Sequence, residues 1–359
     1  MSMDRRNFLK VAAGSGAVVA GLGLAACSGG TASSGSAAGS AAATSDYKVT
    51  MVTDMGGVND QSFNQSAWEG LQQLQDDYGI EVSYTESKQE SDYATNLDRA
   101  VDAGNNLVWG IGFAMADAIM TAAQQNPDVS FAIVDNSWAD DEYPENLTGV
   151  MFRAQEPSFL VGYIAARTTQ TGKVGFVGGI GSNIIDQFEW GYKAGIAHAN
   201  AENGTNVTVD TQYLESFTDA ALGKATAQRM YSDGCDIVFH AAGNAGNGVI
   251  EAAGDADKFV IGVDQDQAHL DPDHVLTSAM KNVNNAVEEI SKQAADGENI
   301  GGQTIELGMT DDAVGIPEEN PLMDQDVYDA AIALEDQIKS GDIVPPATED
   351  DYNTYVASL

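Results

Sequence analysis

Residues Lys48–Gly79 read KVTMVTDMGGVNDQSFNQSAWEGLQQLQDDYG and contain one complete strand–loop–helix unit. The run Lys48–Asp54 is rich in β-branched and apolar residues, which favours a strand. After a polar loop with two glycines, apolar residues recur at helical spacing, at Ala67, Leu71, Leu74 and Tyr78. Gly79 stands where a helix commonly ends. The stretch therefore predicts a strand followed by an amphipathic helix, the repeating unit of an α/β fold.

The same alternation of strands and helices continues along the chain. Several of the further strands are continuous apolar runs, which is typical of strands covered by helices on both faces. Repeated units of this kind predict parallel sheets joined by right-handed crossovers. The further strands are expected at Glu81–Glu86, Asn106–Gly112, Val129–Asn136, Leu147–Phe152, Lys173–Gly178, Val207–Tyr213, Asp236–Ala241, Lys258–Asp264 and His274–Met280.

Ten strands are unusual for one open parallel sheet, so we expect two Rossmann-like lobes with a break near Phe152–Pro157. We assign residues 46–153 and about 274–300 to the first lobe. Residues 154–273 and about 301–359 are assigned to the second, although the sequence does not place 321–359 firmly. The carboxyl ends of the strands of both lobes would meet at a cleft, where ligands bind in open α/β sheets.

The first 45 residues are not expected to belong to the fold. Arg5-Arg6-Asn7-Phe8-Leu9-Lys10 precedes a small, apolar run that is short for a membrane span. The arginine pair resembles a twin-arginine signal over residues 1–26, and Leu24-Ala25-Ala26-Cys27 resembles a bacterial lipobox. The resemblance implies cleavage before Cys27, lipidation of that cysteine, and a location on the outer face of the cytoplasmic membrane. Residues 27–45 then form a flexible Gly/Ser/Ala linker.

The balance of charge excludes several classes of partner. The chain has 16 Lys and Arg against 54 Asp and Glu, a net charge of −38. Nucleic-acid binders need clustered basic residues, and anionic lipid headgroups attract them, so neither partner is expected. Contact with the membrane is expected through the lipid anchor alone. The acidic residues are scattered rather than grouped in blocks, which indicates a solvated surface.

Cysteine and histidine give no sign of a metal site. Besides Cys27 the chain has one cysteine, Cys235, which no motif surrounds, so we interpret it as a small buried residue. The four histidines include no pair at zinc-ligand spacing. We therefore expect neither a metal nor a cofactor.

Four loops that follow predicted strands carry the polar residues from which a site could be built. They are residues 53–65, 110–117, 241–246 and 261–267, with Lys281 after a later strand. Each loop alone has an ordinary interpretation, because glycine-rich turns pack strands against helices and Asp60 or Ser62 would cap a helix. Such caps do not explain Phe63 beside Asn64, where an aromatic ring is exposed unless it stacks on something.

Taken together, the loops resemble the basic membrane lipoprotein family. The matching patterns are Asp-x-Gly-Gly-x-x-Asp-x-Ser-Phe-Asn-Gln, Gly-Phe-x-x-x-Asp, Ala-Ala-Gly and Gly-Val-Asp-x-Asp-Gln, in this order over essentially the whole chain after the linker. Members of this family are substrate-binding lipoproteins of ABC importers, many of them PnrA-like receptors for purine nucleosides. The resemblance implies a type I periplasmic-binding-protein fold, with a nucleoside between the lobes and an ABC permease with its ATPase as partners. Receptors of this kind are usually monomers, so a monomer is expected.

The resemblance also implies roles for individual residues. Asp54 and Asn64 would contact the base, with Phe63 stacked on it and Phe188 as a second aromatic wall. Asp117 would hydrogen-bond near the base or sugar. On the other side, Gly243 would approach the sugar, Asp264 would accept from the ribose hydroxyls, and Lys281 would complete the polar ring. The chain departs from the family at Asn244, where glycine is frequent, and at Met115, where an aromatic residue is common. Both positions are included in the expected site.

Three other functions stay open at this stage. An enzyme is not expected, because the loop Gly175–Gly181 departs from the dinucleotide pattern Gly-x-Gly-x-x-Gly and no Gly-x-Ser-x-Gly elbow occurs. A nucleosidase built on two carboxylates would reveal itself by product formation. The same fold also binds sugars and small signalling molecules, for which four tryptophans are available. The third is a surface adhesin without a transport role.

Overall fold

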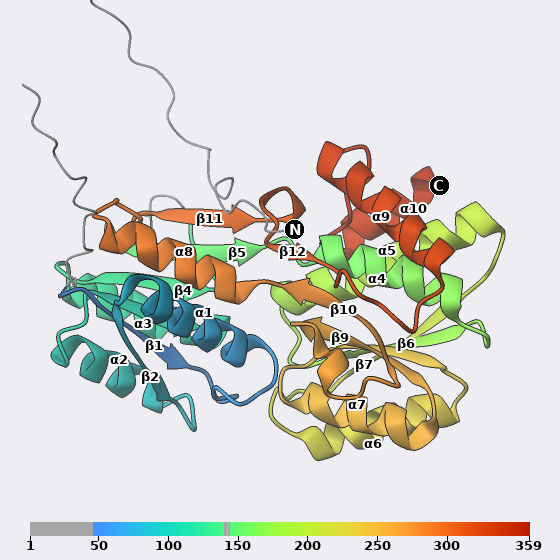
Figure 1. The fold of residues 1–359 in the computed structure, drawn as a ribbon, viewed down its shortest axis with the longest axis horizontal. Helices are drawn as coiled ribbons and strands as arrows, with labels where there is room; N and C mark the ends of the chain where they lie inside the picture. Colours follow the sequence, from blue (N-terminus) through green and yellow to red (C-terminus); the bar gives the residue numbers. More distant parts are fainter. Residues whose placement is uncertain (1–45, 140–141, 143) are drawn as a thin grey trace, which may run out of the picture.

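The computed structural model describes residues 46–139, 142 and 144–359, which form two lobes lying side by side (Figure 1). Each lobe is a mostly parallel sheet with helices packed on it, as the alternation of strands and helices predicts. The expected signal peptide, Cys27 and the expected linker all lie outside the described residues. Within the described part, no helix has the length and apolar character needed to cross a membrane.

The first sheet has the strand order β11-β5-β4-β3-β1-β2, and all of its pairs are parallel. Its central strands are buried on both faces, and every residue of β3 is buried. The strands are β1 Lys48–Thr53, β2 Glu81–Glu86, β3 Leu107–Ile111, β4 Ser130–Val134, β5 Leu147–Phe152 and β11 Gln303–Leu307.

The second sheet repeats this plan with the order β12-β10-β9-β8-β6-β7. Only the short pair of β10 with β12 is antiparallel among the described pairs. The strands are β6 Lys173–Gly178, β7 Thr208–Tyr213, β8 Ile237–Ala241, β9 Phe259–Asp264, β10 Val275–Lys281 and β12 Val314–Gly315. The repeated order places β9 of the second lobe where β4 stands in the first.

All ten expected strands are present, but two parts of the chain lie in the opposite lobe from the one expected. Strand β10, expected in the first lobe, pairs in parallel with β9 of the second sheet. Pairing with β9 buries residues 275–279 in the second lobe, including the polar residues Thr277 and Ser278. Strand β11 was not expected, and it pairs with β5 of the first sheet. It is an edge strand in which only Leu307 is buried, and such a strand gives a weaker signal than a continuous apolar run.

The helices pack in pairs within each lobe. In the first lobe α1 Phe63–Tyr78 lies against α8 Val283–Ala295, and α2 Asp92–Asp102 lies against α3 Ala116–Gln125. In the second lobe α4 Gln155–Thr168 lies against α5 Asn183–Asn203, and α6 Ala220–Ser232 lies against α7 Ala245–Ala256. The last two helices, α9 Gln325–Ser340 and α10 Glu349–Ser358, pack on α4 and α5, so the C-terminal segment covers the second lobe (Figure 1).

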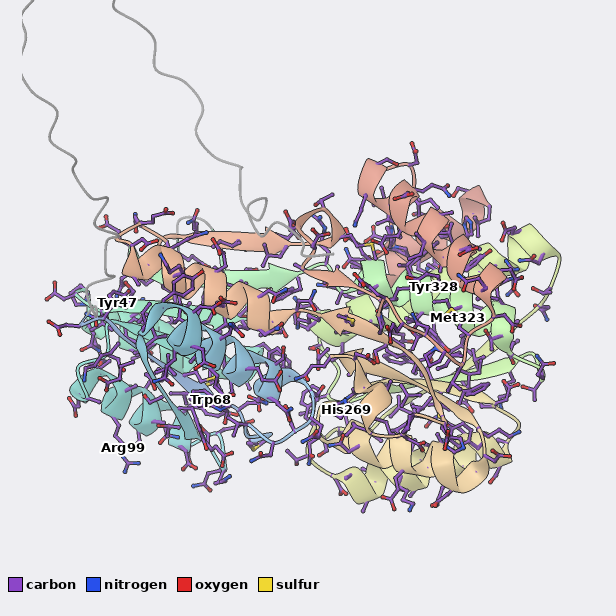
Figure 2. The ribbon with its side chains drawn as sticks, viewed as in Figure 1. Tyr47, Trp68, Arg99, His269, Met323 and Tyr328 are labelled. Carbon is purple, nitrogen blue, oxygen red and sulfur yellow. The ribbon has the colours of Figure 1, made fainter. Side chains whose placement is uncertain are left out.

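Glycine allows α4 and α5 to approach closely. A Cβ atom at Gly195 of α5 would lie 1.9 Å from the carbonyl oxygen of Phe159 in α4, and one at Gly162 of α4 would lie 2.1 Å from that of Tyr192. Neither backbone can move away without separating the helices. Met323 and Tyr328 extend the covering of this lobe from the C-terminal segment (Figure 2).

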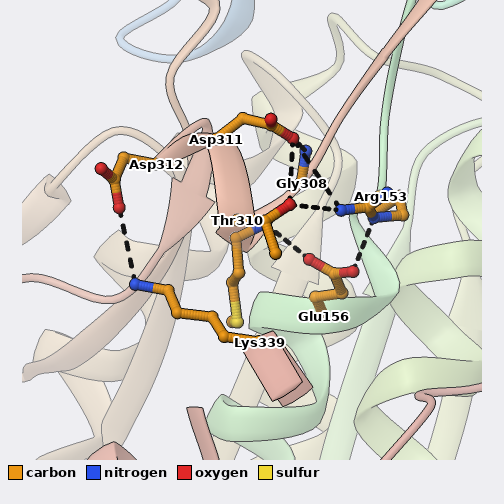
Figure 3. Close-up of polar contacts among 8 residues, drawn as sticks. Arg153, Glu156, Gly308, Thr310, Asp311, Asp312 and Lys339 are labelled. Carbon is orange, nitrogen blue, oxygen red and sulfur yellow. Dashed lines mark hydrogen bonds and ion pairs between the residues drawn. The ribbon is translucent and has the colours of Figure 1, made fainter. Parts of the chain in front are cut away.

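Within the described residues the chain passes between the lobes after β5, after β10 and after β11. Arg153 lies in the first of these crossovers and bonds to the third crossover (Figure 3). Its Nε donates to Glu156 at 2.6 Å and its Nη2 donates to Thr310 at 3.1 Å, while Glu156 accepts the backbone N–H of Met309. A Cβ atom at Gly308 would lie 2.1 Å from Nη2, so glycine leaves room for the guanidinium group. The first and third crossovers are therefore held together where the lobes join.

Candidate interlobe binding site

A cavity of about 300 Å³ lies between the lobes, at the carboxyl ends of the strands of both sheets. This is where open α/β sheets bind their ligands. Eight of the ten residues expected to bind a ligand line it: Asp54, Phe63, Asn64, Phe188, Gly243, Asn244, Asp264 and Lys281.

The other two expected residues, Met115 and Asp117, do not line the cavity. Met115 is fully buried in the core of the first lobe, and Asp117 is exposed on the first turn of α3. Between β3 and α3 the chain makes a short 3-10 turn, η2 Phe113–Met115, which begins after Gly112 with a φ of +110°. The turn directs Phe113 and Ala114 to the cavity instead. Helical periodicity could not predict which residues of this turn face the cavity, because the regular helix begins only after the turn, at Ala116.

Asp60 organises the loop between β1 and α1. Its Oδ1 accepts the backbone N–H groups of Ser62 and Gln65, each at 3.0 Å. Its Oδ2 accepts both the backbone N–H and the side-chain Nδ2 of Asn64, at 2.9 Å. This carboxylate therefore satisfies the free donors at the start of α1 and also orients Asn64. The same Nδ2 donates to Asp54 Oδ1 at 2.9 Å, which joins the three side chains in one network.

Burial changes the acidity of these carboxyl groups. Burial raises the pKa of Asp54 to about 6, although the hydrogen bonds from Gly56 and Asn64 oppose the shift. Burial also raises the pKa of Asp60. In the second lobe, burial raises the pKa of Asp264 to about 6 against the opposing charge of Lys281. The cavity therefore has two carboxyl groups that change charge in the mildly acidic range.

Lys281 supplies the positive charge at this site. Its side chain is 2% exposed, and its Nζ donates to Asp135 Oδ1 at 2.6 Å. Asp135 follows β4 in the first lobe, whereas Lys281 ends β10 in the second, so the ion pair joins the lobes. The ammonium group also lies over two rings, 4.8 Å from the centroid of Phe63 and 5.1 Å from that of Phe152.

The start of α1 is hydrogen-bonded to the second lobe through three consecutive carbonyl groups. Asn247 Nδ2 donates to the carbonyl of Asp60 at 3.0 Å. Gln267 Nε2 donates to the carbonyl of Gln61 at 2.8 Å, and Gln265 Nε2 donates to that of Ser62 at 3.0 Å. We call these three side-chain amides, Asn247, Gln265 and Gln267, the amide latch. They hold the loop that carries Asp60 against the start of α7 and the loop that follows β9.

The cavity also contains residues that sequence reasoning did not assign to it. Phe113 of the first lobe and Phe217 of the second meet edge to face, with ring centroids 6.2 Å apart. Tyr93 and Asp135 line the cavity from α2 and from the end of β4. Asp135 did have a signal, since it follows an apolar strand as Asp264 does, and both have φ near +65°. Phe217 lies in an irregular loop, where no periodicity singles it out.

None of the four tryptophans lines the cavity. Trp109 is fully buried and donates to Ser291 at 2.9 Å, while Trp68 lies within the first lobe against Tyr84 (Figure 2). Trp138 packs on the core of the first lobe, and Trp190 lies against Tyr352 of α10. Among the described residues, no group of three or more His, Cys, Asp or Glu side chains is placed to hold a metal ion.

Comparisons with known proteins agree with this architecture. A sequence model of the family described as "ABC transporter substrate-binding protein PnrA-like" matches residues 47–349. Basic membrane protein A of Borreliella burgdorferi is 38% identical over 86% of this chain and 90% of its own. The CD4+ T-cell-stimulating antigen of Listeria monocytogenes is 41% identical over 84% of this chain and 88% of its own. A crystal structure of an ABC transporter solute-binding protein from Aeropyrum pernix superimposes with a TM-score of 0.78 at 26% identity, covering 86% of this chain and 96% of that one.

Proposed function

Because the chain belongs to the family of PnrA-like ABC transporter substrate-binding proteins, we propose that it captures a purine nucleoside between its lobes and delivers it to a permease. Membership of the family implies a transported ligand and a permease with its ATPase as partners. The identity of the ligand, the lipid anchor at Cys27 and the delivery step belong to the proposal.

The observation that carries the proposal is the lining of the cavity, which combines apolar side chains with carboxylate groups. Phe63, Phe113, Phe188 and Phe217 line it together with Ile184 and Ile185. A nucleobase presents two flat apolar faces, and stacking on aromatic side chains contributes about 1–3 kcal/mol per base. The volume of about 300 Å³ falls at the lower end of the range for small-molecule sites.

The polar groups suit the sugar of a nucleoside. Asp264 lines the cavity together with Gly243 and Lys281, and its carboxylate can accept hydrogen bonds from a vicinal diol. Hydrogen bonds to a charged acceptor are stronger than neutral ones. Asp54, Asp60, Asp135 and Glu90 also line the cavity, where Lys281 is the only lysine or arginine among the lining residues. A phosphate group would meet net negative charge there, so nucleosides are favoured over nucleotides.

The test is a calorimetric titration of the domain from Asp46 onward. The panel contains inosine, guanosine, adenosine, uridine, 2′-deoxyguanosine, free hypoxanthine, ribose, glucose and inosine monophosphate. The proposal predicts one-to-one binding of purine ribonucleosides, with weaker binding of the deoxynucleoside and of the monophosphate. The samples are then analysed for free base, because release of base would identify a nucleosidase instead of a receptor.

A sugar is the alternative ligand for this fold. Tryptophan faces are the usual platforms for sugar rings, and the four tryptophans lie away from the cavity. Binding of ribose or glucose with no response to any nucleoside would establish the alternative and reject the nucleoside.

A further inference from the structure

We propose that the hydroxyl of Tyr93 donates a hydrogen bond to the polar edge of the bound base and thereby selects which bases bind. This inference rests on the proposed function, because it assigns one more contact to the same cavity. Tyr93 lies outside the loops that resemble the family, in the first turn of α2.

The surroundings of Tyr93 point to a ligand. The residue is 3% exposed and lines the interlobe cavity. Its hydroxyl is buried and has no hydrogen-bond partner among the described residues. Buried hydroxyl groups in folded proteins are nearly always paired, because an unpaired one loses its hydrogen bonds to water without replacement. A ligand in the cavity would supply the missing partner.

Asn64 provides a second unpaired atom at the same cavity. Its Nδ2 donates to Asp54 and to Asp60, which fixes the orientation of the amide group. Its Oδ1 is buried and has no partner in the part of the chain that the structure describes. Asn64 is 2% exposed and also lines the cavity. The orientation matters because it leaves an acceptor, and not a donor, for the ligand.

Tyr93 acts as a donor at neutral pH. Burial, followed by the negative charge of the nearby Asp54, raises the pKa of its hydroxyl to about 12. The hydroxyl therefore keeps its proton. The cavity offers one donor from Tyr93 and one acceptor from Asn64, which complements a carbonyl group beside an N–H group. The 6-oxopurines inosine and guanosine present these two groups side by side, whereas purine riboside has neither.

The test compares Tyr93→Phe with the parent protein, using inosine and purine riboside as ligands. We expect the variant to bind inosine about 3- to 10-fold more weakly, the effect of losing one neutral hydrogen bond. Its affinity for purine riboside should change by less than about 2-fold, because that ligand has no carbonyl to lose. The ratio of the two affinities does not depend on how much of the variant is folded, so partial unfolding cannot imitate the result.

Tyr192→Phe is the matched control. Tyr192 is also fully buried with an unpaired hydroxyl, but it lies in the core of the second lobe and not at the cavity. Its removal should leave both affinities unchanged. Equal affinities of Tyr93→Phe and parent for inosine, or an equal loss for both ligands, would overturn the role of Tyr93 while the nucleoside site stands. A parent protein that binds no nucleoside would overturn the proposed function and this inference with it.

Discussion

Ser62, at the start of α1 in the first lobe, donates its hydroxyl hydrogen to the carboxylate of Asp264, at the end of β9 in the second. Both side chains are buried, and Asp264 also lines the cavity. The carboxylate assigned to the ribose therefore also joins the lobes. Closure and ligand recognition depend on the same group, so a change at Asp264 should affect both.

The amide latch should slow the release of ligand. Gln265→Ala removes the hydrogen bond to the carbonyl of Ser62, and Asn247→Ala removes the one to Asp60. One neutral hydrogen bond contributes about 0.5–1.5 kcal/mol, so each variant should bind nucleoside about 2- to 10-fold more weakly through a faster dissociation rate. Stopped-flow fluorescence measures that rate. Gln228→Ala is the control, since Gln228 is exposed and its side-chain amide donates to Asp255 in its own lobe. Parent-like dissociation from both latch variants would show that these bonds do not hold the lobes.

Asp264 should make the stability of the unliganded protein depend on pH. Its pKa is raised to about 6 by burial, so folding favours the protonated form. Its contribution to stability is therefore complete below the ordinary pKa near 3.8 and is lost as the pH rises through about 6. Asp264→Asn avoids the buried charge, so it should have a higher Tm than the parent at pH 8 and nearly the same Tm at pH 4. Thermal unfolding followed by circular dichroism measures both. A lower Tm at pH 8 would contradict this account.

The raised pKa of Asp264 should have the opposite effect on nucleoside affinity, which should be higher at high pH. The charged carboxylate is the stronger acceptor for the ribose hydroxyls, so nucleoside affinity should fall as the pH decreases below about 6. Asp264→Asn should bind weakly at every pH and should lack the part of the pH dependence that Asp264 contributes. Calorimetric titrations between pH 5 and pH 8 make the comparison. If the affinity had the same pH profile in both proteins, Asp264 would not contact the ligand.

The buried ion pair of Lys281 and Asp135 should be sensitive to the loss of one partner. Lys281→Met leaves the carboxylate of Asp135 buried without its counter-ion, and such changes cost about 3–5 kcal/mol of stability. The double variant with Asp135→Asn should recover much of this loss, because no buried charge is then left unpaired. Urea denaturation without ligand measures the free energy of unfolding.

Lys48→Met is the control for the ion pair. Lys48 contacts Glu81 at 3.1 Å, but both side chains are exposed, at 39% and 67%. Pairs of this kind contribute about 1 kcal/mol or less. If Lys281→Met were no more destabilising than Lys48→Met, the buried pair would not support the junction of the lobes.

Close packing of α4 and α5 should not tolerate a methyl group at Gly195. The added Cβ would meet the backbone oxygen of Phe159 at 1.9 Å, so Gly195→Ala should destabilise the second lobe by about 1–3 kcal/mol or more. Gly315→Ala is the control, because no atom lies within 4 Å of a Cβ at that position. Chemical denaturation compares the two variants, and equal stabilities would show that the helices separate easily.

The sequence by itself determined most of the elements, all but the strands β11 and β12, and the class of the fold. Continuous apolar runs and helical spacing depend on neighbouring residues alone, so the ten expected strands are all found. The loops after strands also predicted most of the cavity, since the carboxyl ends of parallel strands meet at one edge. Asp54, Asn64 and Asp264 reach the cavity for this reason.

Only the tertiary structure decided which sheet each late strand joins and which side chains meet across the lobes. Strand β10 extends the second sheet and β11 the first. The residues of neither strand indicate which strand it pairs with. Lys281 and Asp135 are separated by 146 positions in the chain, and Tyr93 reaches the cavity from a helix that no motif marks. These outcomes depend on packing between distant segments, which local periodicity does not record, and therefore only the folded lobes determine them.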